Sequence, residues 1–176
     1  VDVDKFLKKS KEKNIFIIED AAEVIGQTYK NKKCGSFGDI STLSFYPNKH
    51  ITTGEGGMIL TDDKNIKDRA DAIRNLFFNN KNRFIHEEIG FNFRMTNLQA
   101  ALGIGQLSRI ESNLKIKRQI GNIYNDNFAQ LKNIRLPLKE YNYSKNIYWV
   151  YPVFYYGKKD AKKIINDLKN LNIGTR

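Results

Sequence analysis

The sequence predicts an α/β fold, and three observations support this prediction. A helix-like stretch over residues 2–13 is followed at once by the short apolar run Ile15–Ile18. An unbroken apolar run of this length is typical of a fully buried parallel strand. Further short strands follow along the chain, and 40% of the 176 residues are hydrophobic and 12% aromatic, which is ample for a core.

Turns and short strands come next. We expect a short helix over residues 21–25 and a turn-rich hairpin or loop over residues 29–39, which contain two glycines. Short strands are expected at residues 42–46 and 57–61. Helix followed by strand in this way favours a layered arrangement of helices on a sheet.

Helices are predicted through the middle of the chain. Asp62 or Asp63 can cap a helix that runs to about Phe78, because apolar residues recur there at helical spacing. We expect residues 79–90 to be polar and mobile.

A long helical tract then begins at Thr96, whose hydroxyl can cap it, and its apolar stripe continues to Phe128 with a bend near residues 108–113. An aromatic strand over residues 147–156 and an amphipathic helix over residues 161–171 follow.

The change of character after the long helix predicts two units. We expect an incomplete large α/β domain over residues 1–109 and part of a smaller α+β domain over residues 110–176. The chain begins at Val1 without an initiator methionine, so we treat it as a piece of a longer protein.

Composition limits the class of protein. No apolar run approaches the roughly 18 residues that span a bilayer, and no signal peptide is evident, so we expect a cytoplasmic protein that makes no membrane contact. The single cysteine, Cys34, has no companions at metal-ligand spacing, so no metal site is predicted.

A net charge of +11 favours an anionic partner without naming it. The lysines are scattered and no nucleic-acid-binding motif is present, so we expect no nucleic-acid partner. A basic domain that binds anions or nucleic acid remains an alternative.

Two charged residues are candidates for chemistry. Asp20 follows the predicted buried strand, and ligands of open α/β sheets bind beyond the carboxyl ends of strands. Asp20 could face a ligand or, alternatively, cap the next helix. Lys49 precedes the run Thr52–Gly57, which permits close backbone approach and offers hydroxyls and amides to an anion. Ser44, five residues before the lysine, could add a phosphate hydrogen bond.

This pair of residues suits one cofactor, pyridoxal 5'-phosphate (PLP). Its aldehyde needs a lysine for a Schiff base, and its ring nitrogen needs a carboxylate that keeps it protonated. The order of residues is unlike a Walker A phosphate loop, because Lys49 precedes the glycines.

Five motifs in order carry a resemblance to a known family. They are Ile17-Ile-Glu-Asp20-Ala-Ala22-Glu, Gly35-Ser-Phe-Gly-Asp39, Ser44-Phe-Tyr-Pro-Asn-Lys49, Thr53-Gly-Glu-Gly-Gly57 and Gly90-Phe-Asn-Phe-Arg-Met-Thr-Asn97-Leu-Gln-Ala-Ala-Leu-Gly103. The chain resembles the DegT/DnrJ/EryC1/StrS sugar aminotransferases, and within them the perosamine-synthase-like branch, which aminates a 4-keto-6-deoxy nucleotide sugar. The resemblance implies the PLP-dependent aminotransferase fold of type I, present here in part.

The resemblance also implies roles for individual residues. Lys49 would form the internal aldimine with PLP and then shuttle protons, and Asp20 would pair with the pyridinium nitrogen. Ala22 would lie against the ring, Glu23 would lie close to the cofactor, and Ser44 would bind the phosphate.

Further roles fall on substrate and partner contacts. Asn92 and Arg94 match a segment that reaches a neighbouring subunit's cofactor phosphate and substrate, so Asn92 is predicted to bind cofactor and Arg94 substrate. His50, beside Lys49, is also predicted to contact substrate. The implied partners are a nucleotide sugar, glutamate as amino donor, and a second subunit in a homodimer with shared active sites.

The lysine separates two branches of the family. The dehydratase branch carries histidine in its place, so Lys49 favours amination over deoxygenation. Full-length members extend beyond this chain at both ends and carry further phosphate-binding and ring-stacking residues there. The alternative is therefore a catalytically silent remnant that persists as a folded dimerisation or binding module.

Overall fold

The computed structural model describes residues 1–78 and 84–176, so part of the segment 79–90 that we expected to be mobile lies outside the described residues. The helices are α1 (Val3–Lys13), α2 (Lys64–Arg74), α3 (Asn97–Leu107), α4 (Ile110–Phe128) and α5 (Ala161–Asn170). The strands are β1 (Ile18–Asp20), β2 (Thr28–Tyr29), β3 (Lys32–Lys33), β4 (Ile40–Ser44), β5 (Gly57–Leu60), β6 (Ile134–Arg135), β7 (Glu140–Tyr141), β8 (Ser144–Lys145) and β9 (Phe154–Tyr155).

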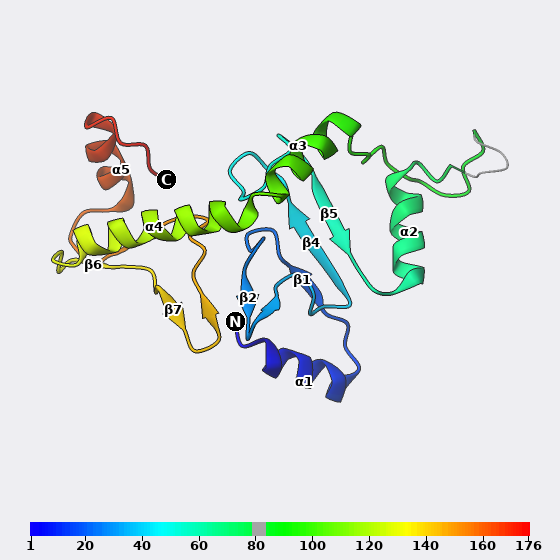
Figure 1. The fold of residues 1–176 in the computed structure, drawn as a ribbon, viewed down its shortest axis with the longest axis horizontal. Helices are drawn as coiled ribbons and strands as arrows, with labels where there is room; N and C mark the ends of the chain where they lie inside the picture. The colour runs from blue at the N-terminus through cyan, green and yellow to red at the C-terminus, as the bar shows by residue number, and fades with distance from the viewer. Residues whose placement is uncertain (79–83) are drawn as a thin grey trace.

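A three-stranded sheet in the order β1-β4-β5 lies at the centre of the first half of the chain (Figure 1). β1 and β4 run parallel, with Asp20 opposite Thr42, and β5 returns antiparallel to β4, with Ser44 opposite Gly57. Because parallel strands point the same way, β1 and β4 both end at one edge of the sheet. The α/β prediction is confirmed. This edge carries Asp20 and Ser44, and the turn with Lys49 follows directly after β4.

Two local expectations around β1 are wrong. The strand covers Ile18–Asp20 rather than the apolar run before it, and Phe16 and Ile18 are 77% and 72% exposed. They are exposed because side chains project from the faces of a sheet, and among the described elements β1 makes its main contacts with β4, in the plane of the sheet. Residues 21–25 form turns rather than a helix, because the Ala22 N–H donates to the Asp20 carboxylate and the Val24 N–H donates to the Ala21 carbonyl, a three-residue spacing.

The hairpin predicted over residues 29–39 is formed by the short antiparallel pair β2 and β3. The predicted aromatic strand over residues 147–156 is confirmed only at β9, which pairs with β6. Side-chain hydrogen bonds hold the segment before β9 in place of a strand ladder, as in the contact from the Trp149 indole to the Asn48 carbonyl.

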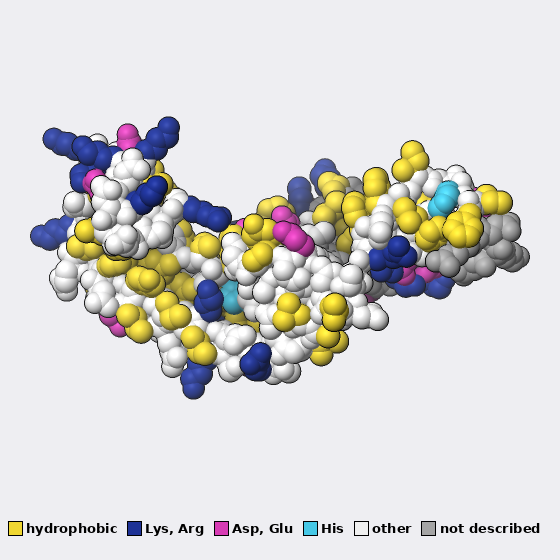
Figure 2. All heavy atoms as spheres, turned by 90° about the horizontal axis from the view of Figure 1, so that it is seen from above, with side chains coloured by type: hydrophobic (Ala, Val, Ile, Leu, Met, Phe, Trp, Pro, Cys, Tyr) yellow, Lys and Arg dark blue, Asp and Glu magenta, His cyan; other side chains and the backbone are white. Residues whose placement is uncertain are grey.

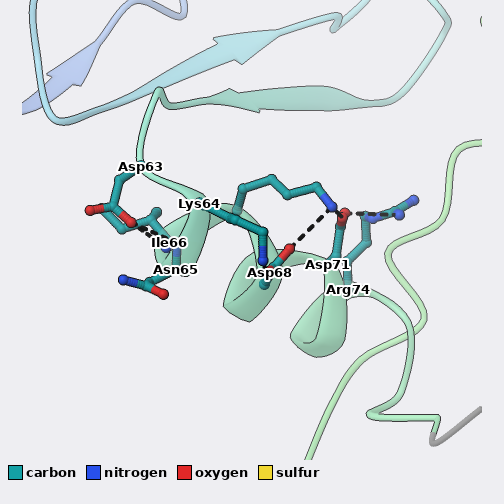
Figure 3. A network of polar contacts seen from close by, with 8 residues as sticks. Asp63, Lys64, Asn65, Ile66, Asp68, Asp71 and Arg74 are labelled. Carbon is teal, nitrogen blue, oxygen red and sulfur yellow. Dashed lines mark hydrogen bonds and ion pairs between the residues drawn. The ribbon is translucent and has the colours of Figure 1, made fainter.

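Asp63 caps α2, as the sequence predicted. Its carboxylate accepts from the N–H groups of Asn65 and Ile66 at 2.7 and 3.1 Å, and Figure 3 shows it at the start of the helix. Further along the helix, the Arg74 guanidinium forms an ion pair with the Asp71 carboxylate at 3.1 Å. The helix ends at Arg74 rather than at Phe78, because the segment after it turns to hydrogen-bond with residues 91–93.

Thr96 caps α3 in a full capping box: its hydroxyl accepts from the Gln99 N–H, and the Gln99 side chain accepts from the Thr96 N–H. This confirms the predicted cap. The predicted bend falls at Ser108 and Arg109, between α3 and α4. From there α4 leads away from the sheet toward α5 (Figure 1). A division into two domains at residue 109 stays a prediction.

Buried apolar residues lie in both halves of the described chain: Ala21, Tyr29, Phe45, Ile51, Leu114, Ile147 and Tyr148. Many large apolar side chains are exposed instead, and Figure 2 shows them on the surface over much of the face drawn there. The buried set includes Phe45 and Ile51, which flank the lysine turn, so packed residues hold both ends of that turn although residues 46–48 are exposed.

Candidate functional site

Lys49 lies on a tight turn directly after β4. Its N–H donates to the Tyr46 carbonyl at 3.0 Å, which closes the turn. The chain then returns along β4: the Thr53 N–H donates to the Phe45 carbonyl, and the Phe45 N–H donates to the Gly56 carbonyl. The lysine is therefore presented on a loop whose two ends are hydrogen-bonded to each other.

The threonine hydroxyls of this loop form hydrogen bonds within the loop. Thr52 Oγ1 donates to the Phe45 carbonyl at 2.9 Å, and Thr53 Oγ1 donates to the Glu55 carbonyl at 2.7 Å. We expected these hydroxyls to be offered to an anion; their protons are instead used within the loop, because the tight turn brings backbone carbonyls within reach. Gln106 of α3 adds a two-way contact, accepting from the Thr52 N–H and donating to the Thr52 carbonyl.

The side chain of Lys49 is only 10% exposed. Its ammonium lies 3.9 Å from the centre of the Trp149 ring and 3.9 Å from Oε1 of Glu23, whose own side chain is 57% exposed. Beside the lysine is an open hollow of about 200 Å³, which lies between the lysine loop and α4 and is lined by Lys49, His50, Asn113, Ile116, Lys117 and Ile120. The structure thus brings Lys49 and Glu23, two predicted site residues, within ion-pair distance.

Asp20 ends β1 at the same sheet edge from which the lysine loop departs. Its side chain is exposed, and its carboxylate accepts from the Ala22 N–H at 3.1 Å, which orients it and leaves its other oxygen for a ligand. Ala22 itself is half-buried. On the adjacent strand Ser44 is half-buried, and its hydroxyl oxygen accepts from the Tyr46 N–H at 3.3 Å. That contact leaves the hydroxyl proton for an acceptor.

His50 is buried, at 8% exposure, and its Nε2 lies 3.1 Å from the Ile147 carbonyl. A carbonyl only accepts, so this nitrogen carries the proton. Burial lowers the pKa of the ring, and the nearby charges of Lys117, Arg118 and Lys49 act in the same direction, while the hydrogen bond to Ile147 opposes them. His50 therefore favours the neutral form, and its predicted contact with substrate stays a prediction.

Asn92 and Arg94 lie on the segment before α3, and both are exposed. The Arg94 Nε donates to the Asn92 amide oxygen at 3.0 Å, and Asn92 pairs with Asn75 at the end of α2. In the part of the chain that the structure describes, no hydrogen bond or ion pair joins either side chain to Lys49 or Asp20. Their proposed reach into a neighbouring subunit's site stays a prediction.

Two residues that hold the lysine loop were not predicted from the sequence. Trp149 contacts both Asn48 and Lys49 from a hundred residues along the chain, and Gln106 grips the backbone of Thr52 from α3. Local spacing gave no sign of either contact. The one available signal was that Trp149 is the single tryptophan of the sequence.

Over residues 1–78 and 84–176 no helix combines the length and apolar character needed to cross a membrane. Over the same residues, no three His, Cys, Asp or Glu side chains come together in a way that could hold a metal ion.

Comparison with known proteins gives consistent matches. The model of the DegT/DnrJ/EryC1/StrS aminotransferase family matches residues 1–176. A GDP-perosamine synthase of Escherichia coli O157:H7 is 37% identical over 175 residues, which are 99% of this chain and 47% of that protein. The chain therefore spans about half the length of the curated relatives it matches.

Solved structures agree on the fold. Helicobacter pylori PseC, an aminotransferase involved in the biosynthesis of pseudoaminic acid, matches with a TM-score of 0.85 and 29% identity over 97% of this chain and 47% of that one. Escherichia coli GDP-4-keto-6-deoxy-D-mannose-3-dehydratase with bound hydrated PLP matches with a TM-score of 0.85 and 24% identity, over 100% of this chain and 49% of that one. These matches confirm the aminotransferase fold, present in part.

Proposed function

Because the chain belongs to the DegT/DnrJ/EryC1/StrS aminotransferase family, we propose that it is the lysine-bearing part of a PLP-dependent sugar aminotransferase. The single observation that carries the proposal is the position of Lys49, shielded on a braced loop after β4, beside the edge where β1 ends in Asp20. Its substrate would be a nucleotide-linked keto-deoxysugar, with glutamate as amino donor. A relative named GDP-perosamine synthase supports the substrate class.

The residues present fit the cofactor. PLP needs an amine, a carboxylate and phosphate-binding donors. Asp20 and Ser44 supply the last two from adjoining strand ends, and Lys49 supplies the amine from the turn after β4. When bound, PLP supplies an electron sink for the carbon that loses a proton.

The side chains of this chain would do the remaining work. Lys49 would bind the cofactor's aldehyde carbon and, once released, would move a proton as general base and acid. Asp20 would keep the ring nitrogen protonated, Ala22 would lie against the ring face, and Ser44 would donate to the phosphate. Glu23, which already lies near the lysine ammonium, would hold that group close to the cofactor.

The assembly and location belong to the same proposal. We place the enzyme in the cytoplasm as a homodimer, in which Asn92 would reach the neighbour's cofactor and Arg94 and His50 would contact substrate. A partner subunit that covers α3 and the segment before it is supported by exposed side chains there. These are Asn92, Arg94 and the apolar residues of α3. A purified chain that sediments only as a monomer would contradict the dimer.

The cofactor role is tested by trapping. The chain is mixed with PLP, its absorbance is recorded, and the mixture is reduced with borohydride and digested for mass spectrometry. We expect an absorbance band of lysine-bound PLP and a reduced adduct on the peptide that contains Lys49, both lost in Lys49→Ala. The matched control is Lys115→Ala on α4, which removes an exposed lysine and should keep both signals.

The outcomes separate the candidate functions. An adduct spread over many surface lysines, or none at all, would contradict the enzyme and favour a silent binding module. Salt-sensitive retention of oligonucleotides that is indifferent to Lys49→Ala would favour a basic nucleic-acid-binding domain instead.

A further inference from the structure

We propose that Trp149 is a positioning residue for Lys49, an inference that rests on the proposed function because it assigns Lys49 the reactive amine. Residues 48–50 and 147–149 are joined by side-chain contacts on both flanks of the lysine. We call these two segments the lysine clamp. The clamp restrains the lysine side chain through contacts made by the protein alone.

Two reciprocal hydrogen bonds form the clamp. The Trp149 indole N–H donates to the Asn48 carbonyl at 3.0 Å, and the His50 ring donates through Nε2 to the Ile147 carbonyl at 3.1 Å. Each segment thus contributes one side chain and one carbonyl. Because the bonds lie on either side of Lys49, they restrain the backbone from which its side chain projects.

The indole also contacts the lysine side chain directly. Its ring centre lies 3.9 Å from Nζ of Lys49, within the range of cation–π attraction, and Oε1 of Glu23 lies at 3.9 Å from the same nitrogen. A free lysine samples many rotamers, so two attractive contacts at its end narrow the positions that the amine visits. Small displacements of a reacting group slow catalysis, so restricting the positions of the Lys49 amine would favour the reaction.

Tyr148 anchors the clamp to the second half of the chain. It is 5% exposed, its hydroxyl accepts from the Asn125 amide at 2.9 Å, and its N–H donates to the Asn146 amide oxygen at 2.8 Å. Its ring packs against Gly121 of α4 so closely that a Cβ there would lie 2.6 Å from ring carbons. The backbone next to Trp149 is therefore held against α4, while the indole itself contacts the lysine loop.

The first experiment uses the cofactor-free chain and its single tryptophan. One indole signal is expected in a two-dimensional ¹⁵N–¹H NMR spectrum, and it needs no assignment because the sequence has one tryptophan. Lys49→Met keeps an unbranched side chain only one heavy atom shorter and removes the charge. We expect the indole signal and the tryptophan fluorescence to shift in Lys49→Met and to stay unchanged in the matched control Lys115→Met. An unchanged indole in Lys49→Met overturns the proposal.

The second experiment measures the lysine. The cofactor-free chain is labelled briefly with acetic anhydride, and the labelling of Lys49 is read by mass spectrometry relative to that of exposed Lys115. We expect Trp149→Leu to raise the relative labelling of Lys49 by roughly threefold, the order of a modest cation–π contact. Trp149→Phe, which keeps an aromatic face but lacks the N–H, should return part of the protection. Equal labelling in the wild type and Trp149→Leu overturns the proposal.

These outcomes are independent of the cofactor test. If PLP is trapped on Lys49 but the indole NMR signal and the fluorescence are unchanged in Lys49→Met, the proposed function stands and the positioning role is wrong. If the indole responds but no PLP is trapped, the clamp stands and the enzyme proposal falls. Circular dichroism of Trp149→Leu checks its folding, and the Lys49→Met measurement decides the question should that variant unfold.

Discussion

At the scale of single residues, burial and hydrogen bonding determine how the lysine's surroundings behave. His50 is the clearest case: it is buried beside Lys49, Lys117 and Arg118, and its ring donates to the Ile147 carbonyl. Protonating this ring would bury a charge among cations. The neutral ring therefore belongs to the folded state.

The pH dependence of stability follows from this burial. Burial lowers the pKa of His50 in the folded chain, so the unfolded chain takes up a proton at higher pH, near the ordinary value of about 6.5. The free energy of unfolding is then largest above that pH and falls as the pH drops below it. Chemical unfolding of the wild type and His50→Gln between about pH 5 and 8 measures this slope. We expect a flatter profile in His50→Gln.

A matched His86→Gln variant removes the other imidazole of the chain and controls for that loss. It should retain the slope of the wild type over the same pH range. If His50→Gln keeps the full slope, the buried ring is not its cause.

The motif residues were predictable from the sequence, but the distant residues that contact them were not. Asp20 and Lys49 stand in short motifs, so the end of β1 at Asp20 and the turn with Lys49 after a strand followed from the local pattern, while their chemical roles stay predictions. Trp149 lies 101 residues from the Asn48 carbonyl that it contacts, and no local spacing encodes such a pairing. The expectation that the loop hydroxyls bind an anion was wrong for a related reason. They donate to backbone carbonyls whose positions the sequence does not reveal.

At the scale of elements, caps were predicted well and strands less well. Asp63 and Thr96 cap helices where the sequence placed them, because a cap depends only on three or four consecutive residues. The apolar run Ile15–Ile18 predicts a buried strand, yet most of its side chains are exposed, because burial depends on which elements cover the faces of the sheet and not on the run itself.

The cap of α3 gives a prediction at this scale. Thr96→Ala removes the hydroxyl that accepts from the Gln99 N–H, and we expect it to lower the free energy of unfolding by about 1 kcal/mol. Thr96→Ser keeps a hydroxyl at the same place and is the matched control. Urea unfolding of the three proteins measures the difference, and equal midpoints for Thr96→Ala and the wild type would refute the cap's contribution.

At the scale of the whole molecule, α4 links the two halves of the described chain. Its Gly121 receives the Tyr148 ring, and Tyr148 in turn places the residues on either side of it against the lysine loop. The sequence indicated a long helix with a bend, both of which are confirmed, but it did not indicate which glycine of that helix receives a ring.

Two helical glycines allow a matched comparison. Gly121→Ala would place a Cβ 2.6 Å from the Tyr148 ring, so we expect a loss of roughly 1–3 kcal/mol in stability and a shifted indole signal of Trp149. Gly105 on α3 has open space around it, so Gly105→Ala should be neutral or stabilising by up to about 1 kcal/mol. Thermal unfolding measures both variants. Equal stability of the two would show that the close approach at Gly121 is relaxed without cost.

The long separation between Asn48 and Trp149 has a consequence for biosynthesis. A ribosome adds Trp149 only 101 residues after Asn48, and at roughly 5–20 residues per second this takes about 5–20 s. Throughout that interval the Lys49 side chain of the nascent chain lacks its contact with the Trp149 ring. If Trp149 positions Lys49 as proposed, the amine takes up its position only after the segment that carries Trp149 has been synthesised and has packed against the lysine loop.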